Sequence, residues 1–558
     1  MRLRPDVMAG ISIVSLAVAA AATGITNGFA FDDVYIIKNN PAVHSFWPLW
    51  EFLTESYWPP ERGGDLYRPF TMLSFSAQWF VGGGSPLAFH ITSIVLYAGV
   101  CAAFFWVTIA LLPLPVAWLA GALFAVHPLH VESVGNVVGQ AELWAALFML
   151  LGLAVFLRAR SRGSLSGKDA ALIAVSYALG LLSKEHAIVL PAVLLAAELT
   201  VSPRTVPLRH RLIAIRPLLL AMGAIALAFL WVRTAVLAET RGVPPDTTSL
   251  FVNQPYGFRA MTMLAVVLQW ARLLIWPATL TADYSPRHIE LVTSPNIDVL
   301  AGVAILVALL VIAMQHRRSA PVLTFGIAWM VVSLLIPSNL IIPTGFVMAE
   351  RTLFAASAGA MLCVGWVAMK FVPDFTRLSE VPRRVTLTAI AGVLLMGVVA
   401  SASRQRVWRD NETLFTQTIA DAPGSYRARM AYAAILFELK QKTEGFKQLD
   451  IANNLFPDDP PLLEFAAEEY AKAGKCPVSA RLYKKIVDKY PTHLSARIGL
   501  VGCLIVLRDH ATARAVARAG LTTGIPQTAL RQLIHINDSV EIAERMNRGK
   551  SSTPPARN

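Results

Sequence analysis

Two adjacent carboxylates, Asp32 and Asp33, follow the first long apolar segment, which covers residues 8–27. An ionisable group at a membrane surface is costly unless it is solvated or paired, so such a pair is a functional candidate. One carboxylate could take a proton from a hydroxyl group while a hydrogen-bond donor holds the other. The alternative is a hydrated helix end that only marks the interface.

Three cations lie beside other apolar segments, on the side expected to carry the two acids. They are Arg68 in Tyr-Arg-Pro, Lys184 in Lys-Glu-His and Arg351 in Ala-Glu-Arg-Thr. Arg offers phosphate a planar fork and Lys offers a point charge, so these residues could converge on one anionic headgroup. Further polar residues expected to shape the same pocket are His127, His130, Glu132, Glu185, Asp283 and Glu350.

No resident metal or soluble cofactor is expected. His127, His130 and Glu132 do not have the His-Glu-x-x-His spacing, and no cysteine or third histidine is close in sequence. A divalent ion shared by Asp32 and Glu132 is the weaker alternative. The glycines at 82–84 lack the lysine of a nucleotide-binding loop.

The composition points to a membrane protein. Of 558 residues, 55% are hydrophobic and 15% are charged, which excludes a disordered or purely soluble chain. The net charge of +13 indicates Lys and Arg at a cytoplasmic membrane edge before it indicates nucleic acid.

Eleven crossings are predicted from the apolar segments. The segment 169–200 is interrupted at Lys184 and Glu185, so it is interpreted as two half-length crossings. The segment 258–278 contains Arg259 and Arg272 and is predicted to be an interfacial or re-entrant helix that does not cross. The other predicted crossings are 8–27, 88–112, 113–127, 142–158, 213–237, 297–314, 321–338, 352–371 and 385–404.

Lys and Arg are concentrated in the loops on the N-terminal side of these crossings. This pattern predicts a cytoplasmic N-terminus, and eleven crossings then place the C-terminal part outside. The basic loops contain Arg2 and Arg4, residues 158–168, residues 204–216, Arg317 and Arg318, and residues 370–384.

The C-terminal part has the period of a helical repeat. Pro423, Pro457 and Pro491 are 34 residues apart, and Pro526 comes one residue late. This is the tetratricopeptide period, so about three stacked helix pairs and a final helix near 527–547 are predicted. A generic helical bundle is the alternative. The tail at 548–558 is expected to be disordered.

Taken in order, these motifs resemble the transmembrane and tetratricopeptide-repeat-containing family over nearly the whole chain. The motifs are Asp-Asp after the first crossing, Tyr-Arg-Pro, His-Pro-x-His-x-Glu, Ser-Lys-Glu, Asp-Tyr-Ser, Ala-Glu-Arg and the C-terminal repeats. The resemblance implies an all-α fold with a multispanning class C glycosyltransferase domain at 1–404. An extracytoplasmic repeat domain at 405–547 then forms an α-solenoid, and the first outer loop covers about 28–87.

That family is similar to the protein O-mannosyltransferases, which take a sugar from a polyprenyl-phosphate carrier. The resemblance implies that Asp32 is the general base and that Asp33 orients the loop or the acceptor. It also implies that Lys184 and Arg351, with Arg68, face the lipid phosphate. One position departs from the family pattern, because Gln140 stands where relatives carry Arg in Gly-Arg-x-Glu-Leu.

The function implied is inverting transfer of a sugar, with mannose favoured, to a protein Ser or Thr hydroxyl. The implied partners are an isoprenoid lipid donor, membrane lipids and a protein or peptide acceptor bound by the repeats, with no nucleic acid. The expected location is a bacterial inner membrane with periplasmic repeats. Three alternatives stay open: transfer to a cell-envelope glycan or lipid, a non-enzymatic scaffold anchored in the membrane, and a transporter or channel.

Overall fold

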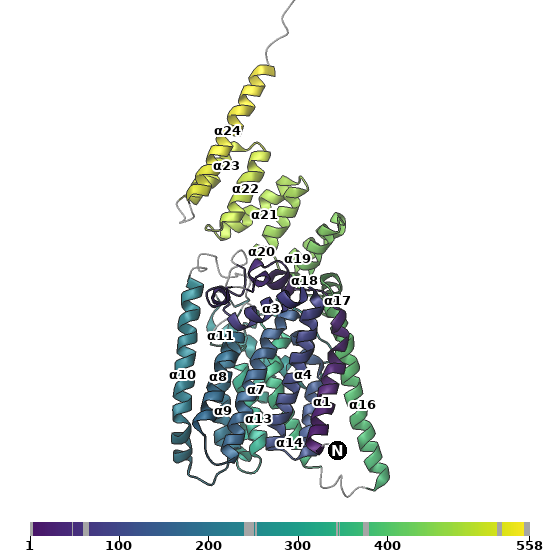
Figure 1. Ribbon diagram of the computed structural model, residues 1–558. Helices are drawn as coiled ribbons and strands as arrows, with labels where there is room; N and C mark the ends of the chain where they lie inside the picture. The colour runs from purple at the N-terminus through teal and green to yellow at the C-terminus, as the bar shows by residue number, and fades with distance from the viewer. Residues whose placement is uncertain are drawn as a thin grey trace, which may run out of the picture. The chain divides into compact units, whose positions relative to one another are not determined.

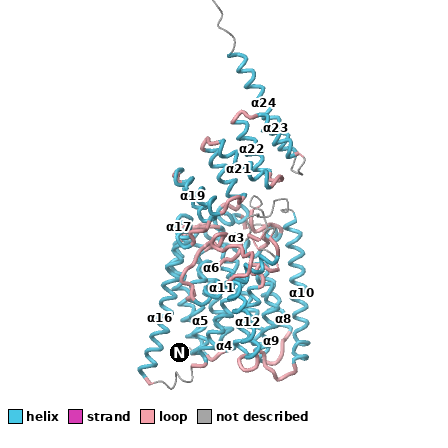
Figure 2. The backbone as a smooth tube through the Cα atoms, turned by 180° about the vertical axis from the view of Figure 1, so that it is seen from behind, coloured by secondary structure: helices cyan, strands magenta, loops and turns pink. Residues whose placement is uncertain are grey.

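A computed structural model describes residues 4–46, 48–59, 66–238, 250–251, 254–341, 344, 346–371, 379–521 and 527–551. These residues contain helices and no β-strand (Figures 1 and 2). Contacts divide the chain into two compact units. The first contains residues 1–284 and 289–423, and the second contains residues 285–288 and 424–558.

Seven of the long helices of the first unit have proline in their first turn, where a helix does not need the missing N–H. The long helices are α1 (Pro5–Ala21), α3 (Pro69–Gly82), α4 (Pro86–Leu111), α5 (Leu114–Ala125), α7 (Gln140–Ser161), α8 (Gly167–Ser183), α9 (Leu190–Thr200), α10 (Leu208–Ala238), α11 (Tyr256–Ile275), α12 (Ile297–His316), α13 (Pro321–Leu334), α14 (Phe354–Met369), α16 (Glu380–Gln405) and α17 (Asn411–Asp421). Short helices between them include α2 (Pro41–His44) and α6 (Val131–Gly135).

Eight described helical segments are long and apolar enough to cross a membrane, and a ninth would be the pair formed by α5 and Pro128–Gly135, bent by 47°. The chain is therefore a multi-pass integral membrane protein. The eight segments are Pro5–Thr26, Pro86–Leu111, Val137–Ser161, Leu208–Ala238, Tyr256–Ile275, Ile297–His316, Glu350–Met369 and Glu380–Trp408. Seven of them match predicted crossings, and the eighth is α11.

Three predicted crossings are shorter helices: α8 has 17 residues, α9 has 11 and α13 has 14. Two ion pairs give the directions of α8 and α9. Lys184, between these helices, pairs with Glu142 in the first turn of α7, whereas Glu198 in α9 pairs with Arg160 at the other end of α7. The chain therefore runs along α7 twice, once in α8 and once in α9, as predicted for this interrupted segment.

The segment 258–278 is predicted to be either an interfacial or a re-entrant helix. The helix α11, which covers most of it, is continuous and therefore not re-entrant. Its length and apolarity would allow a crossing. Its contacts favour the other prediction, an interfacial helix. The Thr262 hydroxyl accepts the Val292 N–H (2.9 Å) just before α12, and the Leu274 carbonyl contacts His127 Nε2 (3.2 Å). Contacts near both ends of α11 are thus on the side where α12 begins. The other end of α12 lies near Arg204, which donates a hydrogen bond to the Arg317 carbonyl (2.8 Å).

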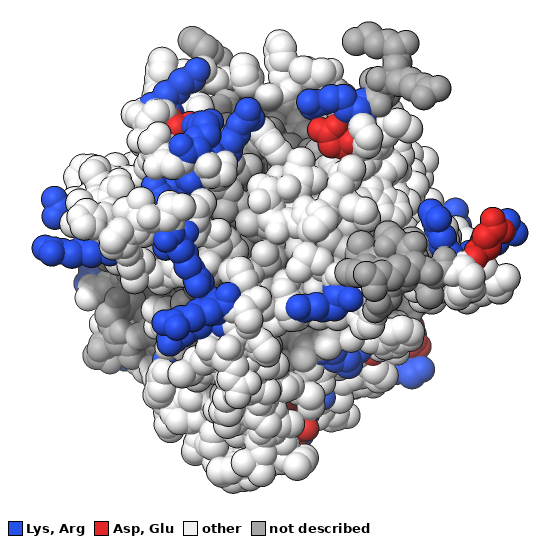
Figure 3. Space-filling view, turned by 90° about the horizontal axis from the view of Figure 1, so that it is seen from below, with Lys and Arg blue, Asp and Glu red and all other residues white. Residues whose placement is uncertain are grey.

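Basic side chains gather at the end of the first unit where α1 begins. Figure 3 views this end and shows many more Lys and Arg side chains than acidic ones. The distribution agrees with the predicted concentration of positive charge on one side. Two parts of that prediction, Arg2 and residues 372–378, lie outside the described residues.

The second unit is a series of helix pairs in which each helix packs against the next. Pro457 and Pro491 come two residues after the ends of α19 and α21, so the 34-residue period marks the end of each pair. The structure thus agrees with the predicted α-solenoid. The helices are α18 (Tyr426–Glu438), α19 (Lys442–Leu455), α20 (Pro460–Lys472), α21 (Cys476–Lys489), α22 (Leu494–Val506), α23 (His510–Gly520) and α24 (Gln527–Ser551).

The ends of the repeat region differ in detail from the prediction. The helix α17, which the sequence analysis assigns to the repeats, packs within the first unit. The last helix continues to Ser551, four residues beyond the predicted end at 547. Pro526 of the predicted repeat period lies outside the described residues. Residues 552–558 of the tail predicted to be disordered also lie outside them.

Candidate active site

Asp33 anchors the loop that follows α1. Its carboxylate is fully buried and accepts backbone N–H groups from Val138 (2.8 Å), Val137 (3.1 Å) and Ala30 (3.5 Å). Burial raises the pKa of Asp33 to about 8, although these three donors favour the ionised form. Because these donors surround both of its oxygens, Asp33 is suited to positioning and not to contact with an acceptor.

Asp32 has a different environment. Its side chain is half-buried and lies within electrostatic range of Arg351, Glu132 and Arg68. Burial raises the pKa of Asp32 to about 6; the two arginines oppose this rise and Glu132 adds to it. A carboxylate with a pKa slightly below neutral is ionised at pH 7 and still able to accept a proton, as a general base requires.

Two of the three predicted phosphate-binding cations, Arg351 and Arg68, lie within electrostatic range of Asp32, and all three cations are paired with carboxylates. Arg351 contacts Glu132 through its guanidinium (2.8 Å) and its backbone N–H (2.7 Å). Arg68 Nε contacts Glu185 at 3.0 Å, and Lys184 pairs with Glu142. Electrostatic coupling among the three cations places the pairs in one cluster. An incoming phosphate would therefore share these cations with carboxylates already present.

Glu142 was not among the predicted site residues. It lies in the first turn of α7, and its side chain is almost fully buried against Lys184. A buried ammonium group such as that of Lys184 is costly unless a carboxylate compensates its charge, and Glu142 supplies that carboxylate. The signal in the sequence was an acidic residue at the start of an apolar segment, ten residues after Glu132.

The two predicted histidines hold helices together. His130 is buried between Phe124 and Phe354, and its ring nitrogens contact the Tyr97 hydroxyl (3.0 Å) and Ser357 Oγ (2.8 Å). His127 accepts the Leu129 N–H (3.3 Å) and reaches the end of α11. Both therefore shape the pocket through structural contacts.

Glu350 lies next to this cluster and orders a neighbouring loop. Its Oε1 accepts the Tyr284 hydroxyl (2.9 Å) and the Thr281 N–H (2.5 Å). The contacts described for Asp283 involve its main chain and Thr281 Oγ1, at 3.4 and 3.5 Å. Tyr284 of the Asp-Tyr-Ser motif thus reaches the carboxylate cluster.

Arg404, at the end of α16, is also part of this region. Only 11% of its side chain is exposed, and it pairs with Asp421 of α17 (2.7 Å). The guanidinium therefore lies inside the protein, within electrostatic range of Glu350.

Gln140, the departure from the family pattern, makes its hydrogen bonds with α3 and α4. Its amide pairs reciprocally with Gln78 (2.8 and 2.9 Å) and donates to the Phe89 carbonyl (3.0 Å) and Ser93 Oγ (3.1 Å). The side chain is fully buried. Gln140 therefore joins α7 to α3 and α4.

A metal would have to compete with existing contacts. Both oxygens of Glu132 accept hydrogen bonds from Arg351. In the part of the chain that the structure describes, no group of three or more His, Cys, Asp or Glu residues is arranged to hold a metal ion. An ion shared by Asp32 and Glu132, the alternative that the sequence leaves open, would have to displace Arg351 from Glu132.

Comparison with known proteins finds several protein O-mannosyl-transferases among the relatives of this chain. No family model matches the chain. It is 26% identical to protein O-mannosyl-transferase TMTC3 of Mus musculus over 477 residues, which is 80% of this chain and 51% of that protein. It is 27% identical to protein O-mannosyl-transferase TMTC4 of Homo sapiens, covering 75% of this chain and 62% of that protein. The chain thus spans between half and two thirds of the length of these relatives.

Proposed function

Because the chain is a homologue of the TMTC proteins, we propose that it is an inverting glycosyltransferase that moves a sugar from a polyprenyl phosphate to a hydroxyl acceptor. The observation that supports this most is the position of Asp32 among Arg68, Glu132 and Arg351. The names of the relatives favour mannose as the sugar and protein as the acceptor.

The proposed step needs a base and a stabilised leaving group. Asp32 takes the proton of the acceptor hydroxyl as that oxygen attacks the anomeric carbon. The bond from this carbon to the phosphate oxygen breaks, and the electron pair leaves with the polyprenyl phosphate. Arg351 and Lys184 stabilise the charge that develops on that phosphate. Attack opposite the leaving group inverts the anomeric centre.

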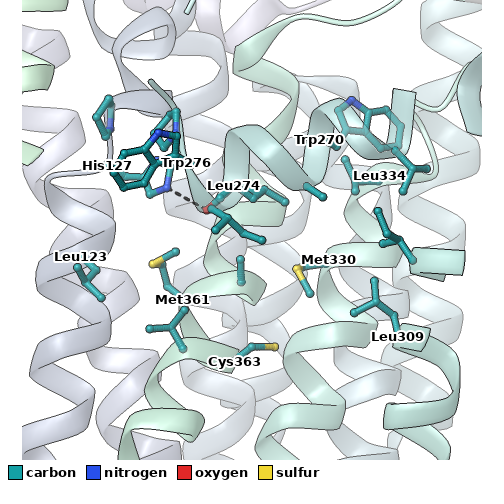
Figure 4. A pocket seen from close by; sticks show the side chains of 18 of the residues that line it. Leu123, His127, Trp270, Leu274, Trp276, Leu309, Met330, Leu334, Met361 and Cys363 are labelled. Atoms are coloured by element: carbon teal, nitrogen blue, oxygen red, sulfur yellow. Dashed lines mark hydrogen bonds between the residues drawn. The ribbon is translucent and has the colours of Figure 1, made fainter. Parts of the chain in front are cut away.

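An apolar cavity in the first unit supports a lipid-linked donor. It has a volume of about 830 Å³ and is lined by α5, α11, α12, α13, α14 and α16 (Figure 4). His127 lies at its edge, five residues before Glu132, and Met361 of α14 lies in its wall, ten residues after Arg351. One of the cations, Arg351, is thus next to a helix that lines the cavity, as a hydrocarbon chain with a phosphate headgroup requires.

The location and the role of the repeats follow from the same proposal. The basic end of the first unit faces the cytoplasm, and the acids lie on the opposite side of the membrane, periplasmic in a bacterium. The helix pairs of the second unit bind the acceptor protein, because stacked helical repeats offer extended surfaces to peptides.

A donor screen tests the proposal. The purified protein in lipid nanodiscs is given polyprenyl-phosphate hexoses or nucleotide hexoses, together with Ser- and Thr-containing peptides. We expect transfer from the lipid donors alone and an inverted anomeric configuration in the product. Transfer from nucleotide sugars, or retention of configuration, would contradict the proposal. Glycopeptides and lipid-linked glycans compared after gene deletion separate protein acceptors from envelope acceptors.

A further inference from the structure

A second group of buried polar atoms lies beside Asp32, around Arg68. The Arg68 guanidinium stacks on the ring of Tyr57, with Cζ 4.8 Å from the ring centroid, and its edge is held by Glu185 Oε2. Tyr57 is 1% exposed and lies within electrostatic range of Asp32 and Asp33. His186 follows Glu185 in the chain and is coupled electrostatically to Arg68 and Lys184.

Four atoms of this group are buried and lack a well-formed hydrogen bond within the described chain, although the Tyr57 hydroxyl is close enough to Arg68 to feel its charge. They are Tyr57 Oη, Glu185 Oε1, His186 Nδ1 and His186 Nε2. An unsatisfied buried polar atom costs about 1–3 kcal/mol, so a cluster of them is unusual unless a ligand completes it. We infer that Tyr57, Glu185 and His186 form the subsite that recognises the hydroxyl groups of the donor sugar.

The chemistry of these atoms distinguishes a sugar from a phosphate. A carboxylate oxygen only accepts hydrogen bonds, and an ionised phosphate also only accepts, so Glu185 Oε1 would repel a phosphate. A sugar hydroxyl both donates and accepts. It can therefore donate to Glu185 Oε1, and it can accept from the Tyr57 hydroxyl or from the N–H of a neutral imidazole.

This inference rests on the proposed function and changes the role of one predicted residue. Arg68 was expected to bind the lipid phosphate. In the structure its guanidinium is fixed by Glu185 and covered by Tyr57 on one face. Arg68 is therefore a positioning residue for the sugar subsite, and phosphate binding falls to Arg351 and Lys184.

Tyr57→Phe is the appropriate variant, because it removes one oxygen and keeps the ring that stacks on Arg68. Tyr177→Phe is its matched control. Tyr177 is 1% exposed, its hydroxyl also has no partner in the described chain, and it lies in α8. Any general effect of losing a buried phenol hydroxyl should appear equally in both variants.

The test is a double-mutant cycle between Tyr57→Phe and deoxy analogues of the donor sugar. We expect Tyr57→Phe to lower kcat/KM about 10-fold with the intact donor. For one deoxy donor, the wild-type protein should show a similarly lowered kcat/KM. With that donor, Tyr57→Phe should not lower kcat/KM any further. Sugar-free polyprenyl phosphate should inhibit both proteins equally, because the subsite does not bind the phosphate.

Several outcomes would overturn the inference. Tyr57→Phe could lower kcat/KM no more than Tyr177→Phe does. Alternatively, the loss from Tyr57→Phe could add to the loss caused by every deoxy donor. A parallel loss of inhibition by polyprenyl phosphate would assign the hydroxyl to the phosphate instead. If the wild-type protein transfers no sugar from any polyprenyl-phosphate hexose, the proposed function fails as well, and that result is recognised before any variant is made.

Discussion

The backbone N–H of Phe31 donates a hydrogen bond to Asn411 Oδ1 over 2.6 Å, which joins residues 380 positions apart. Phe31 has φ of +55°, in the left-handed region, and is the residue before Asp32. Its ring packs edge-to-face on Trp408 and Phe415, at centroid distances of 6.4 and 5.9 Å. This conformation costs a non-glycine residue about 1 kcal/mol or more, so α17 and the turn before it hold the acidic loop in place.

Asn411→Ala should therefore lower activity without unfolding the protein. The Phe31 N–H loses its partner, and the carboxylate of Asp32 is less precisely placed. We expect kcat/KM to fall about 10-fold, since small displacements of a reacting group are costly. The measurement is sugar transfer alongside the melting temperature. Asn453→Ala, in α19 of the second unit, is the control, and an equal loss of activity there would contradict this role for Asn411.

Two truncations should give different results for the same reason. A chain ending at Pro423 keeps α17 and should still use short peptides, while losing acceptor proteins that need the repeats. A chain ending at Arg409 loses Asn411 and should be inactive with both. The measurement is transfer to a peptide and to a folded acceptor, in parallel. If the two truncations behave alike, α17 does not support the active loop.

The rate should depend on the ionisation of Asp32. A general base works only when ionised, and burial raises the pKa of Asp32 to about 6. We expect kcat/KM to be low at pH 5, to rise through about pH 6 and to level off above pH 7. The profile is measured with an acceptor that does not titrate in this range. A profile that is flat between pH 5 and 7 would exclude Asp32 as the base.

Asp32 should also destabilise the protein at neutral pH. Its pKa in the folded protein is above the ordinary value of 3.8, so the folded state binds its proton more tightly than the unfolded state does. The ionised carboxylate therefore costs stability above about pH 6, and this cost disappears as the pH falls toward 4. Asp32→Asn should have the higher melting temperature at pH 7.5 and no advantage at pH 4. A variant less stable than wild type at pH 7.5 would show that Asp32 stabilises the fold.

The helices and the general position of the site could be predicted from the sequence, because long apolar segments and a 34-residue period depend on local pattern. Asp32 and Arg351 could be assigned to one region from the expected side of the membrane alone. The pairing of Lys184 with Glu142 could not, because nothing in the sequence says which carboxylate faces a buried cation. The burial of Arg404 against Asp421 was missed for the same reason.

The different roles of the two adjacent acids could not be predicted from the local sequence pattern. Asp32 and Asp33 are chemically identical, and their different roles come from the backbone N–H groups of Val137 and Val138, more than 100 positions away. Tyr57 was also missed, because a tyrosine in an aromatic-rich loop usually marks the membrane interface. Only its contact with Arg68 distinguishes it from such a residue.

The central claim is that Asp32 is the base in sugar transfer from a polyprenyl phosphate. It is tested most directly by single-turnover transfer with Asp32→Asn, using equal amounts of folded protein and a donor bound to saturation. If Asp32 is the base, donor binding persists in this variant while transfer falls by about 1,000-fold or more. Transfer at the wild-type rate in this variant would contradict the claim.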